Sequence, residues 1–319
     1  MKPVFLDKLK GTYGIEIEVG GIEVDKGDRL VASQEKLGEW VVVDDGSIPS
    51  HNNDNDACEG CDCWHYEDGD PCDCHEEGCC HCNYDEEGSE YRSPIFGRRS
   101  ISGRLLQSDK KTYAEIETIL ALLKIHGGFM AKNSSGSTGL HVHVGEEDRD
   151  REVSLATVKV YGYFEKVIDE FHHETRRGND CNWSRSIQTY AKAKGVSLSK
   201  DSSWTDKKIV NVWDYNKGRY VNREIEIDTF YQYRAERYTH VHPNTGHGTT
   251  EYRQAFGTFN AVWAWNWITF CRLMIHCTRE GNGWDHLEQT REGLTHFLTS
   301  SITTKKQAET LVNYLAKEY

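Results

Sequence analysis

The sequence predicts an α+β fold, in which an antiparallel or mixed sheet carries helices on one face. Short segments that alternate between apolar and polar residues, as half-buried strands do, are separated by long segments with helical spacing of apolar residues. These strands and helices do not follow each other in the regular alternation that parallel α/β folds require. Because the 319 residues show neither an internal repeat nor a linker, we expect one domain over residues 1–319.

Five segments are predicted to form strands. In the first, TYGIEIEVGG, Ile15 and Ile17 face one side of the strand, and Glu16 and Glu18 face the other. Pro94 ends the third segment. The five segments are 12–21, 38–47, 89–96, 138–145 and 247–258.

Four segments are predicted to form helices. The first has Ser108 as its N-cap and stops at Gly127 and Gly128. The third is strongly apolar and is expected to be mostly buried, and Thr303 or Thr304 caps the last. The four segments are 108–128, 153–176, 259–281 and 304–316, whereas residues 178–223 are polar and mixed and support no assignment.

The charge of the chain is unevenly distributed. The formal net charge is −13, and fourteen of the 51 acidic residues lie within 51–90, where Lys and Arg are absent. The remaining 37 acidic residues nearly balance the 38 basic ones. The acidic segment argues against binding of a nucleic-acid backbone there, and it could attract cations or amines.

The apolar residues give no indication of a membrane protein. No run of eighteen apolar residues is present, so we expect no transmembrane helix. The N-terminal sequence MKPVFLDKLKGTYG lacks the apolar core of a signal peptide, which predicts a cytoplasmic protein.

Three of the predicted strands each place two polar groups on one face. Each pair alone has an ordinary explanation, as a solvated face, a satisfied pair of histidines or a salt bridge. Together, carboxylates and a histidine converging on one sheet would repel each other unless divalent cations neutralise them. The pairs are Glu16 with Glu18, His141 with His143, and Glu251 with Arg253.

The residue types in these pairs indicate a nucleoside-triphosphate site. Oxygen ligands with few nitrogens suit Mg²⁺ or Mn²⁺, and a neighbouring arginine suits a phosphate group through its planar guanidinium. The chain contains neither G-x-x-x-x-G-K-[ST] nor G-x-G-x-x-G, so the site would be neither a P-loop nor a Rossmann site.

Six segments, in this order, resemble the amidoligase family, whose members are distant relatives of glutamate–cysteine ligase and glutamine synthetase: YGIEIEV, DDGSI, SEYRSP, TGLHVHVG, ERYTHVHPN and TTEYRQAFGT. The resemblance covers about residues 10–260 apart from a Cys-rich stretch. It implies a curved, mainly antiparallel sheet with helices on its outer face, as in those two ligases. It also implies an ATP-dependent ligase that phosphorylates a carboxylate and joins it to an amine, in a bacterial or phage-infected cell.

The resemblance further implies roles for individual residues. Arg253 matches a phosphate-binding arginine, and His143 lies nearer the nucleotide. Arg237 is implied to contact the phosphoryl group or the carboxylate substrate, and Asp45 matches an acidic position on the side of the acceptor amine. The residues that match ligands of Mg²⁺ or Mn²⁺ are Glu16, Glu18, Glu90, His141 and Glu251.

Residues 51–88 are predicted to form a Cys-rich, acidic insertion. It has too few aliphatic residues for an apolar core, so it needs a cross-link, such as a metal or disulfides, or stays disordered. Clustered cysteines in a reducing cytoplasm favour a metal, and eight could hold two Zn²⁺ ions. An iron–sulfur cluster and then a disulfide knot are the alternatives. The candidate ligands are Cys58, Cys61, Cys63, Cys72, Cys74, Cys79, Cys80, Cys82, His65, His75 and His81.

The insertion falls between Asp45 and Glu90, two of the predicted site residues. This position suggests a lid that helps select the second substrate, a small or peptide-borne amine that could be cationic. The alternative is that the insertion only stabilises a loop or docks a partner.

Two other functions remain compatible with the sequence. One is a non-catalytic interaction module that carries zinc on a ligase-like fold. The other is a transition-metal enzyme that uses His141, His143 and Glu251. The sequence names neither the carboxylate nor the amine, and it does not indicate an oligomeric state.

Overall fold

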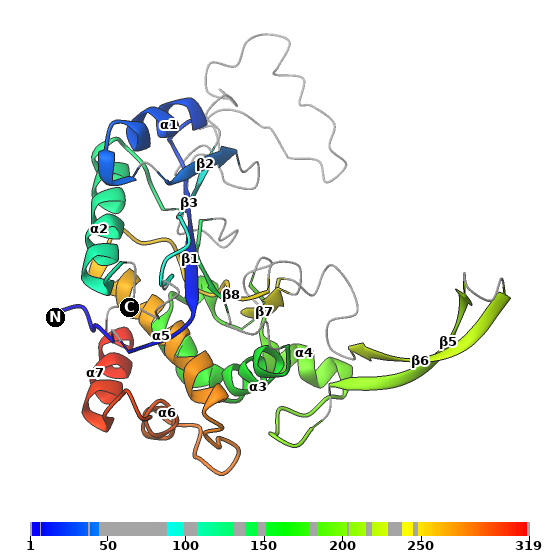
Figure 1. Cartoon of the computed structure of the whole chain (residues 1–319). Helices are drawn as coiled ribbons and strands as arrows, with labels where there is room; N and C mark the ends of the chain where they lie inside the picture. Colours follow the sequence, from blue (N-terminus) through cyan, green and yellow to red (C-terminus); the bar gives the residue numbers. More distant parts are fainter. Residues whose placement is uncertain are drawn as a thin grey trace, which may run out of the picture.

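The structure is a computed structural model (Figure 1). It describes residues 2–6, 8–37, 39–44, 88–98, 107–130, 138–145, 151–178, 184–202, 204–214, 219–228, 238–244 and 248–317. Asp45, Arg237 and the candidate zinc ligands of the Cys-rich insertion lie outside the described residues.

The described residues form an α+β fold around a six-stranded sheet, which confirms the predicted class. The strand order is β2-β3-β1-β4-β8-β7, and neighbouring strands are antiparallel throughout. The strands are β1 Thr12–Val19, β2 Val41–Asp44, β3 Ser89–Arg92, β4 Leu140–Gly145, β7 Val241–Asn244 and β8 Thr249–Tyr252.

One face of this sheet is covered by helices. The buried residues Ile15, Ile17, Val142 and Tyr252 belong to this face. Helix α5 packs against β4, and helix α3 packs against β7 (Figure 1). The main helices of this layer are α2 Asp109–Ile125, α3 Arg151–Ile168 and α5 Ala261–Arg279, and α6 Arg291–Phe297 and α7 Lys305–Leu315 complete it near the C-terminus.

Side-chain caps fix where the predicted helices begin. The Ser108 hydroxyl accepts a hydrogen bond from Lys111 N, as the sequence predicts. At the last helix the structure selects Thr304 rather than Thr303, because Thr304 and Gln307 form a reciprocal capping box. Each cap satisfies backbone N–H groups that would otherwise lack partners at the helix start.

Helix α5 is buried almost all around, as its apolar sequence predicts. Its tryptophans Trp263, Trp265 and Trp267 have at most 1% of their surface exposed. A buried ion pair, with Arg272 Nη1 3.2 Å from Asp109 Oδ1, joins α5 to the start of α2. Among the described residues, no helix combines the length and the apolar composition that a membrane crossing requires.

Several predicted segments extend beyond the elements that the structure shows, including the strand predicted over 89–96, which ends at Arg92. The helix predicted over 153–176 ends at Ile168, and the chain continues in two short 3₁₀ turns at Asp169–Phe171 and Glu174–Arg176. The strand predicted over 247–258 has four paired residues, because it leaves the ladder after Tyr252.

Helix α1 (Val24–Ala32) is absent from the sequence-based assignment because a glycine interrupts its helical pattern. A Cβ atom at Gly27 would lie 2.5 Å from Tyr91 Oη, so the glycine allows α1 to pack closely against the sheet. Packing therefore outweighs the poor helix propensity of this residue.

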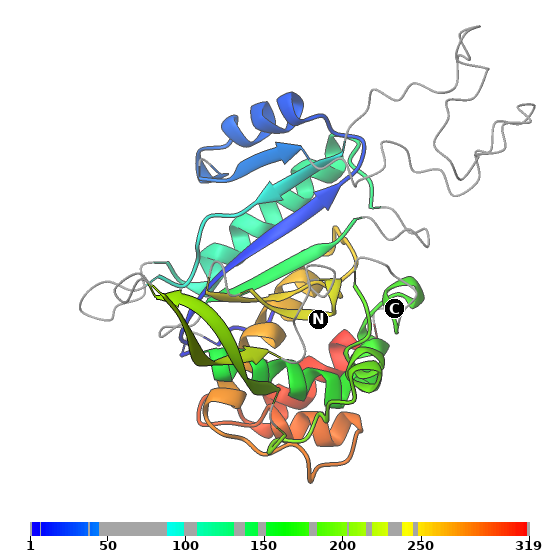
Figure 2. The same cartoon turned by 90° about the vertical axis from the view of Figure 1, so that its right-hand side faces the viewer.

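The segment without an assignment contains helix α4 (Ile187–Lys194), strand β5 (Thr205–Asp214) and the first half of strand β6 (Arg219–Asp228). The two strands pair with each other as a separate antiparallel hairpin. This hairpin extends away from the six-stranded sheet (Figures 1 and 2).

Candidate functional site

The polar face of the sheet gathers the predicted side chains through strand register. In β1, Glu16 lies opposite Arg92 of β3 and His141 of β4, and Glu18 lies opposite Glu90 of β3. Residues directly opposite each other in an antiparallel pair point to the same face. The register of β1 therefore brings charged groups from three strands together.

Strand β8 extends the same face by one strand. Its Glu251 lies opposite His143 of β4. The next neighbour is β7, in which His242 lies opposite Glu251. Carboxylates and imidazoles thus form a continuous polar surface across the sheet.

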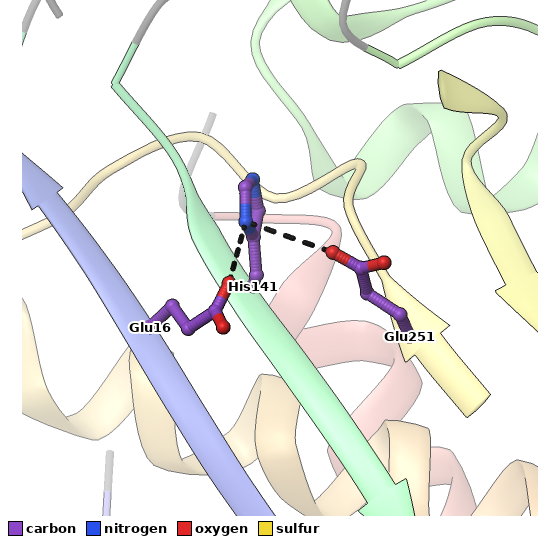
Figure 3. Close-up of side chains that lie close together, drawn as sticks. All are labelled: Glu16, His141 and Glu251. Carbon is purple, nitrogen blue, oxygen red and sulfur yellow. Dashed lines mark hydrogen bonds and ion pairs between the residues drawn. The ribbon is translucent and has the colours of Figure 1, made fainter. Parts of the chain in front are cut away.

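Glu16 and Glu251 lie between the two imidazoles of β4. The Glu16 Oε2 atom is 3.3 Å from His141 Nδ1 (Figure 3), and Glu16 Oε1 is 3.2 Å from His143 Nε2. The Glu251 Oε1 atom is 3.9 Å from His141 Nδ1 and 3.8 Å from His143 Nε2. On the other side of the His141 ring, Glu18 Oε1 is 3.5 Å from Nε2.

Three of these residues lie close enough together to bind one metal ion. One donor atom each from Glu16, His141 and Glu251 lies within 4.8 Å of the other two. His141 and Glu251 are buried, whereas Glu16 is partly exposed, so within this group solvent reaches mainly Glu16. Two carboxylates and one imidazole suit Mg²⁺ or Mn²⁺.

An arginine lies at each side of this group. Arg253 Nη1 forms a short ion pair with Glu251 Oε1, and its guanidinium lies 5.5 Å from the centre of the Tyr238 ring. Arg92 Nε forms a short ion pair with Glu90 Oε1. The side chains differ in access, since 15% of Arg253 and 53% of Arg92 is exposed.

The surroundings keep the central carboxylates ionised. Burial alone would raise the pKa of Glu16, but hydrogen bonds with His141 and His143 outweigh it and hold this pKa well below its usual range. Burial also opposes ionisation of Glu251, yet the charges of Arg253, His143 and His141 lower its pKa overall. Ionised carboxylates are the form that binds a metal cation.

The pKa values of two neighbouring groups are raised rather than lowered. The pKa of Glu90 is raised by burial and then by the charge of Glu16. Burial would lower the pKa of His143, but its hydrogen bond to Glu16 and the charge of Glu251 raise it. The contribution of Glu16 to the first shift, and those of Glu16 and Glu251 to the second, reflect negative charge on this face, which a cation would relieve.

A buried arginine, Arg176, lies next to the site. Arg176 is 1% exposed, and its Nη2 donates to Thr138 O at 2.5 Å, while its Nη1 donates to Arg253 O at 3.5 Å. It thereby joins the start of β4 to the end of β8. A Cβ atom at Gly139 would lie 3.0 Å from Glu18 Oε2 and from His141 Nε2, and 3.3 Å from Arg176 Nη2.

Most residues of this face were predictable from the sequence, and four further residues of the site were not among those predicted. Arg92 repeats the E-x-R spacing of β8, and His242 belongs to a second H-x-H pattern, so both were detectable. Arg176 and Gly139 have no such pattern. The predicted residues that the structure brings together are Glu16, Glu18, Glu90, His141, His143, Glu251 and Arg253.

The fold and this face define an α+β protein whose antiparallel sheet presents a candidate metal group flanked by arginines. The family model described as "Putative amidoligase enzyme" matches residues 9–275, and the chain belongs to this family. A comparison with curated proteins found no match.

Proposed function

We propose that the protein is an ATP-dependent carboxylate–amine ligase that forms an amide bond through an acyl phosphate. Membership of the amidoligase family supports ligase chemistry. The observation that carries the proposal is the group Glu16, His141 and Glu251 beside Arg253. A metal group next to a guanidinium is suited to a nucleoside triphosphate.

The proposed reaction has two steps. An oxygen of the donor carboxylate attacks the γ-phosphorus of ATP, the bond to the β,γ-bridging oxygen breaks, and ADP leaves. The nitrogen of the acceptor amine then attacks the acyl carbon, phosphate leaves, and the nitrogen loses a proton. The products are the amide, ADP and phosphate, and holding the amine beside the acyl phosphate supplies a high effective concentration.

The residues that the family resemblance indicates each have a proposed part in these steps. Arg253, His143 and Arg237 would bind and orient the phosphates, and Asp45 would hold the amine and accept its proton. Mg²⁺ or Mn²⁺ would offset the charge of the transferring phosphoryl group. The residues that would hold the metal are Glu16, Glu18, Glu90, His141 and Glu251.

For the Cys-rich insertion we propose a structural role with Zn²⁺ and a position near the acceptor amine. Its eight clustered cysteines supply enough thiolates for two tetrahedral zinc sites. Its acidity would favour a cationic amine as the acceptor.

The function is tested by incubating the full chain with Mg²⁺, ATP and a pooled library of carboxylic acids, amino acids and amines. We expect release of ADP together with an amide product that mass spectrometry identifies. Glu251→Ala should abolish both signals while the circular dichroism spectrum is retained.

Calorimetry with Mg²⁺ and ATP separates this function from its alternatives. A non-catalytic zinc module or a transition-metal hydrolase would not need the nucleotide. Absence of nucleotide binding, or ADP release that is the same in the Glu251→Ala variant, would overturn the proposal.

A further inference from the structure

The polar face has a second arginine whose role the proposed reaction leaves open. Glu90 and Arg92 of β3 repeat the spacing of Glu251, in β8, and Arg253, which directly follows this strand. Strands β1 and β4 lie between them, so three inter-strand steps separate the two arginines, roughly 14 Å. One phosphate group cannot bridge this distance. The face therefore has one arginine at each end, with the candidate metal group between them.

The two ends differ in access to ligands. Arg253 is largely buried beside Glu251. Arg92 exposes 53% of its side chain and is held by Glu90 through its Nε atom, and this Nε lies 3.9 Å from Glu16 Oε1. A guanidinium that is fixed along one edge and half open to solvent is pre-organised to bind an anion from solution.

An exposed aliphatic residue lies next to Arg92. In β2, Val41 is directly opposite Arg92, so it points to the same face as Arg92 and Glu16. Val41 is 55% exposed, whereas the next residue, Val42, points to the core and is 6% exposed. A guanidinium beside an open apolar side chain fits an anionic group on an aliphatic carbon chain.

The charges nearby favour a carboxylate over a phosphate. Glu16 and Glu90 both lie close to the Arg92 guanidinium. A dianionic phosphate would meet about twice the repulsion from these two groups that a carboxylate meets.

We propose that Arg92 and Val41 form the subsite for the amide donor, in which Arg92 binds a carboxylate group of the donor and Val41 contacts its carbon chain. This subsite rests on the proposed ligase function. It assigns the phosphates to the Arg253 end of the face and the donor to the Arg92 end. The donor enters from the side of β2 and β3, and its reacting carboxylate reaches the metal group beside Glu16.

The test measures binding of carboxylic acids to the full chain by calorimetry, in the presence of Mg²⁺ and a non-hydrolysable ATP analogue. The panel contains acetate, longer straight-chain mono- and dicarboxylic acids, and amino acids. The wild-type protein is expected to bind at least one of them. Arg92→Gln should weaken that binding about tenfold or more, because a charge-assisted hydrogen bond is lost, while affinity for the ATP analogue stays unchanged.

Three further variants test the roles of the guanidinium and of Val41 separately and provide a control. Arg92→Lys keeps the charge but loses the planar fork, so its binding should be intermediate between wild type and Arg92→Gln. Val41→Asn should weaken binding of the longer acids more than binding of acetate. Arg29→Gln, at an exposed arginine of α1, is the matched control and should bind as the wild type does.

Several outcomes would overturn the subsite. They are a wild-type protein that binds no member of the panel, an Arg92→Gln variant that binds as the wild type does, and an Arg92→Gln variant that loses the ATP analogue. If the wild type binds an acid but no nucleotide, and Arg92→Gln weakens binding of that acid, the ligase function fails and Arg92 belongs to a carboxylate site that serves another purpose. If nucleotide binding and amide formation are normal and Arg92→Gln has no effect, the subsite alone fails.

Discussion

At the level of single residues, the site depends on a glycine, Gly139, as much as on charged residues. Gly139 lies where Glu18, His141 and the buried Arg176 approach one another, and a Cβ atom there would come within 3.0 Å of the first two. The glycine lets the polar atoms converge from β1 and β4. A substitution there should displace ligands of the candidate metal group without replacing any of them.

We predict that Gly139→Ala lowers the affinity for Mn²⁺ about tenfold, which is typical of changes around metal ligands. The affinity is measured by electron paramagnetic resonance of free Mn²⁺. Gly14→Ala is the matched control, because it also lies in a strand of this sheet and its nearest neighbour would be Ser93 Oγ at an ordinary 3.5 Å. Equal Mn²⁺ affinities in the two variants would contradict the prediction.

The residue scale also shows what the sequence could predict of the site. Strict alternation in β1 and β4 was enough to place Glu16, Glu18, His141 and His143 on one face, because the side-chain period of a strand is two. Arg176 could not be found in this way. It reaches the site from a 3₁₀ turn after α3, so only the tertiary fold brings it near Gly139.

At the level of elements, helices with a capping residue and a long apolar face were predictable, whereas those defined by packing were not. The sequence predicted α2, α5 and α7 from these features. It gave no assignment for α4, whose start is held by Glu165 from α3. The Glu165 carboxylate accepts hydrogen bonds from Ile187 N at 2.6 Å and Gln188 N at 2.9 Å.

Thr304→Ala should lower the free energy of unfolding by about 1 kcal/mol, because it removes the side-chain cap of α7. Urea unfolding followed by circular dichroism measures this change. Thr304→Ser keeps a hydroxyl cap and should unfold at nearly the wild-type urea concentration. A Thr304→Ser variant as unstable as Thr304→Ala would show that the hydroxyl is not the stabilising group.

Glu165 also links α4 to the end of the sheet. Its Oε1 atom lies 2.7 Å from His240 Nδ1, and both side chains are buried. Burial would raise the pKa of Glu165, but the hydrogen bond and charge of His240 and the hydrogen bonds from Gln188 and Ser186 lower it overall. The carboxylate is therefore expected to stabilise three elements while it is ionised.

Glu165→Gln should destabilise the protein by about 2 kcal/mol at pH 7, because a buried carboxylate loses hydrogen bonds to charged and backbone donors. The pKa of Glu165 is lower in the folded than in the unfolded protein, so its stabilisation is present above the unfolded pKa of 4.5. It is lost as the pH falls through the lower folded pKa. The difference between variant and wild type in urea unfolding should therefore shrink below about pH 4.5.

The nearby Glu170 provides the control for this pH series. It pairs with Arg291 at the surface, where 46% of its side chain is exposed. Glu170→Gln should change the unfolding free energy little at either pH, because exposed ion pairs contribute little. A Glu165→Gln effect that stays constant down to pH 3 would argue against an ionised Glu165 as its cause.

At the level of the whole molecule, the charge is divided between one acidic, Cys-rich segment and a remainder that is nearly neutral. Eleven acidic residues lie within 55–86, and this range contains no Lys or Arg. The insertion is joined in the chain to β2 and β3, the two strands that carry Val41 and Arg92. A field of this sign beside the proposed acceptor position would attract a cationic amine and repel an anionic one.

Replacing residues 55–86 by a short Gly/Ser loop should therefore change which acceptor amines react and leave the affinity for ATP unchanged. For a cationic amine, we expect kcat/KM of the wild type to fall steeply as KCl increases, because salt screens the attraction between exposed charges. In the loop variant this salt dependence should be largely lost, and kcat/KM at low salt should be lower. For a neutral amine the two proteins should behave alike, and affinity for ATP should be the same in both. If the loop variant has the same acceptor range, KM and salt dependence as the wild type, the insertion does not select the amine. Its cysteines would then stabilise a loop or bind a partner.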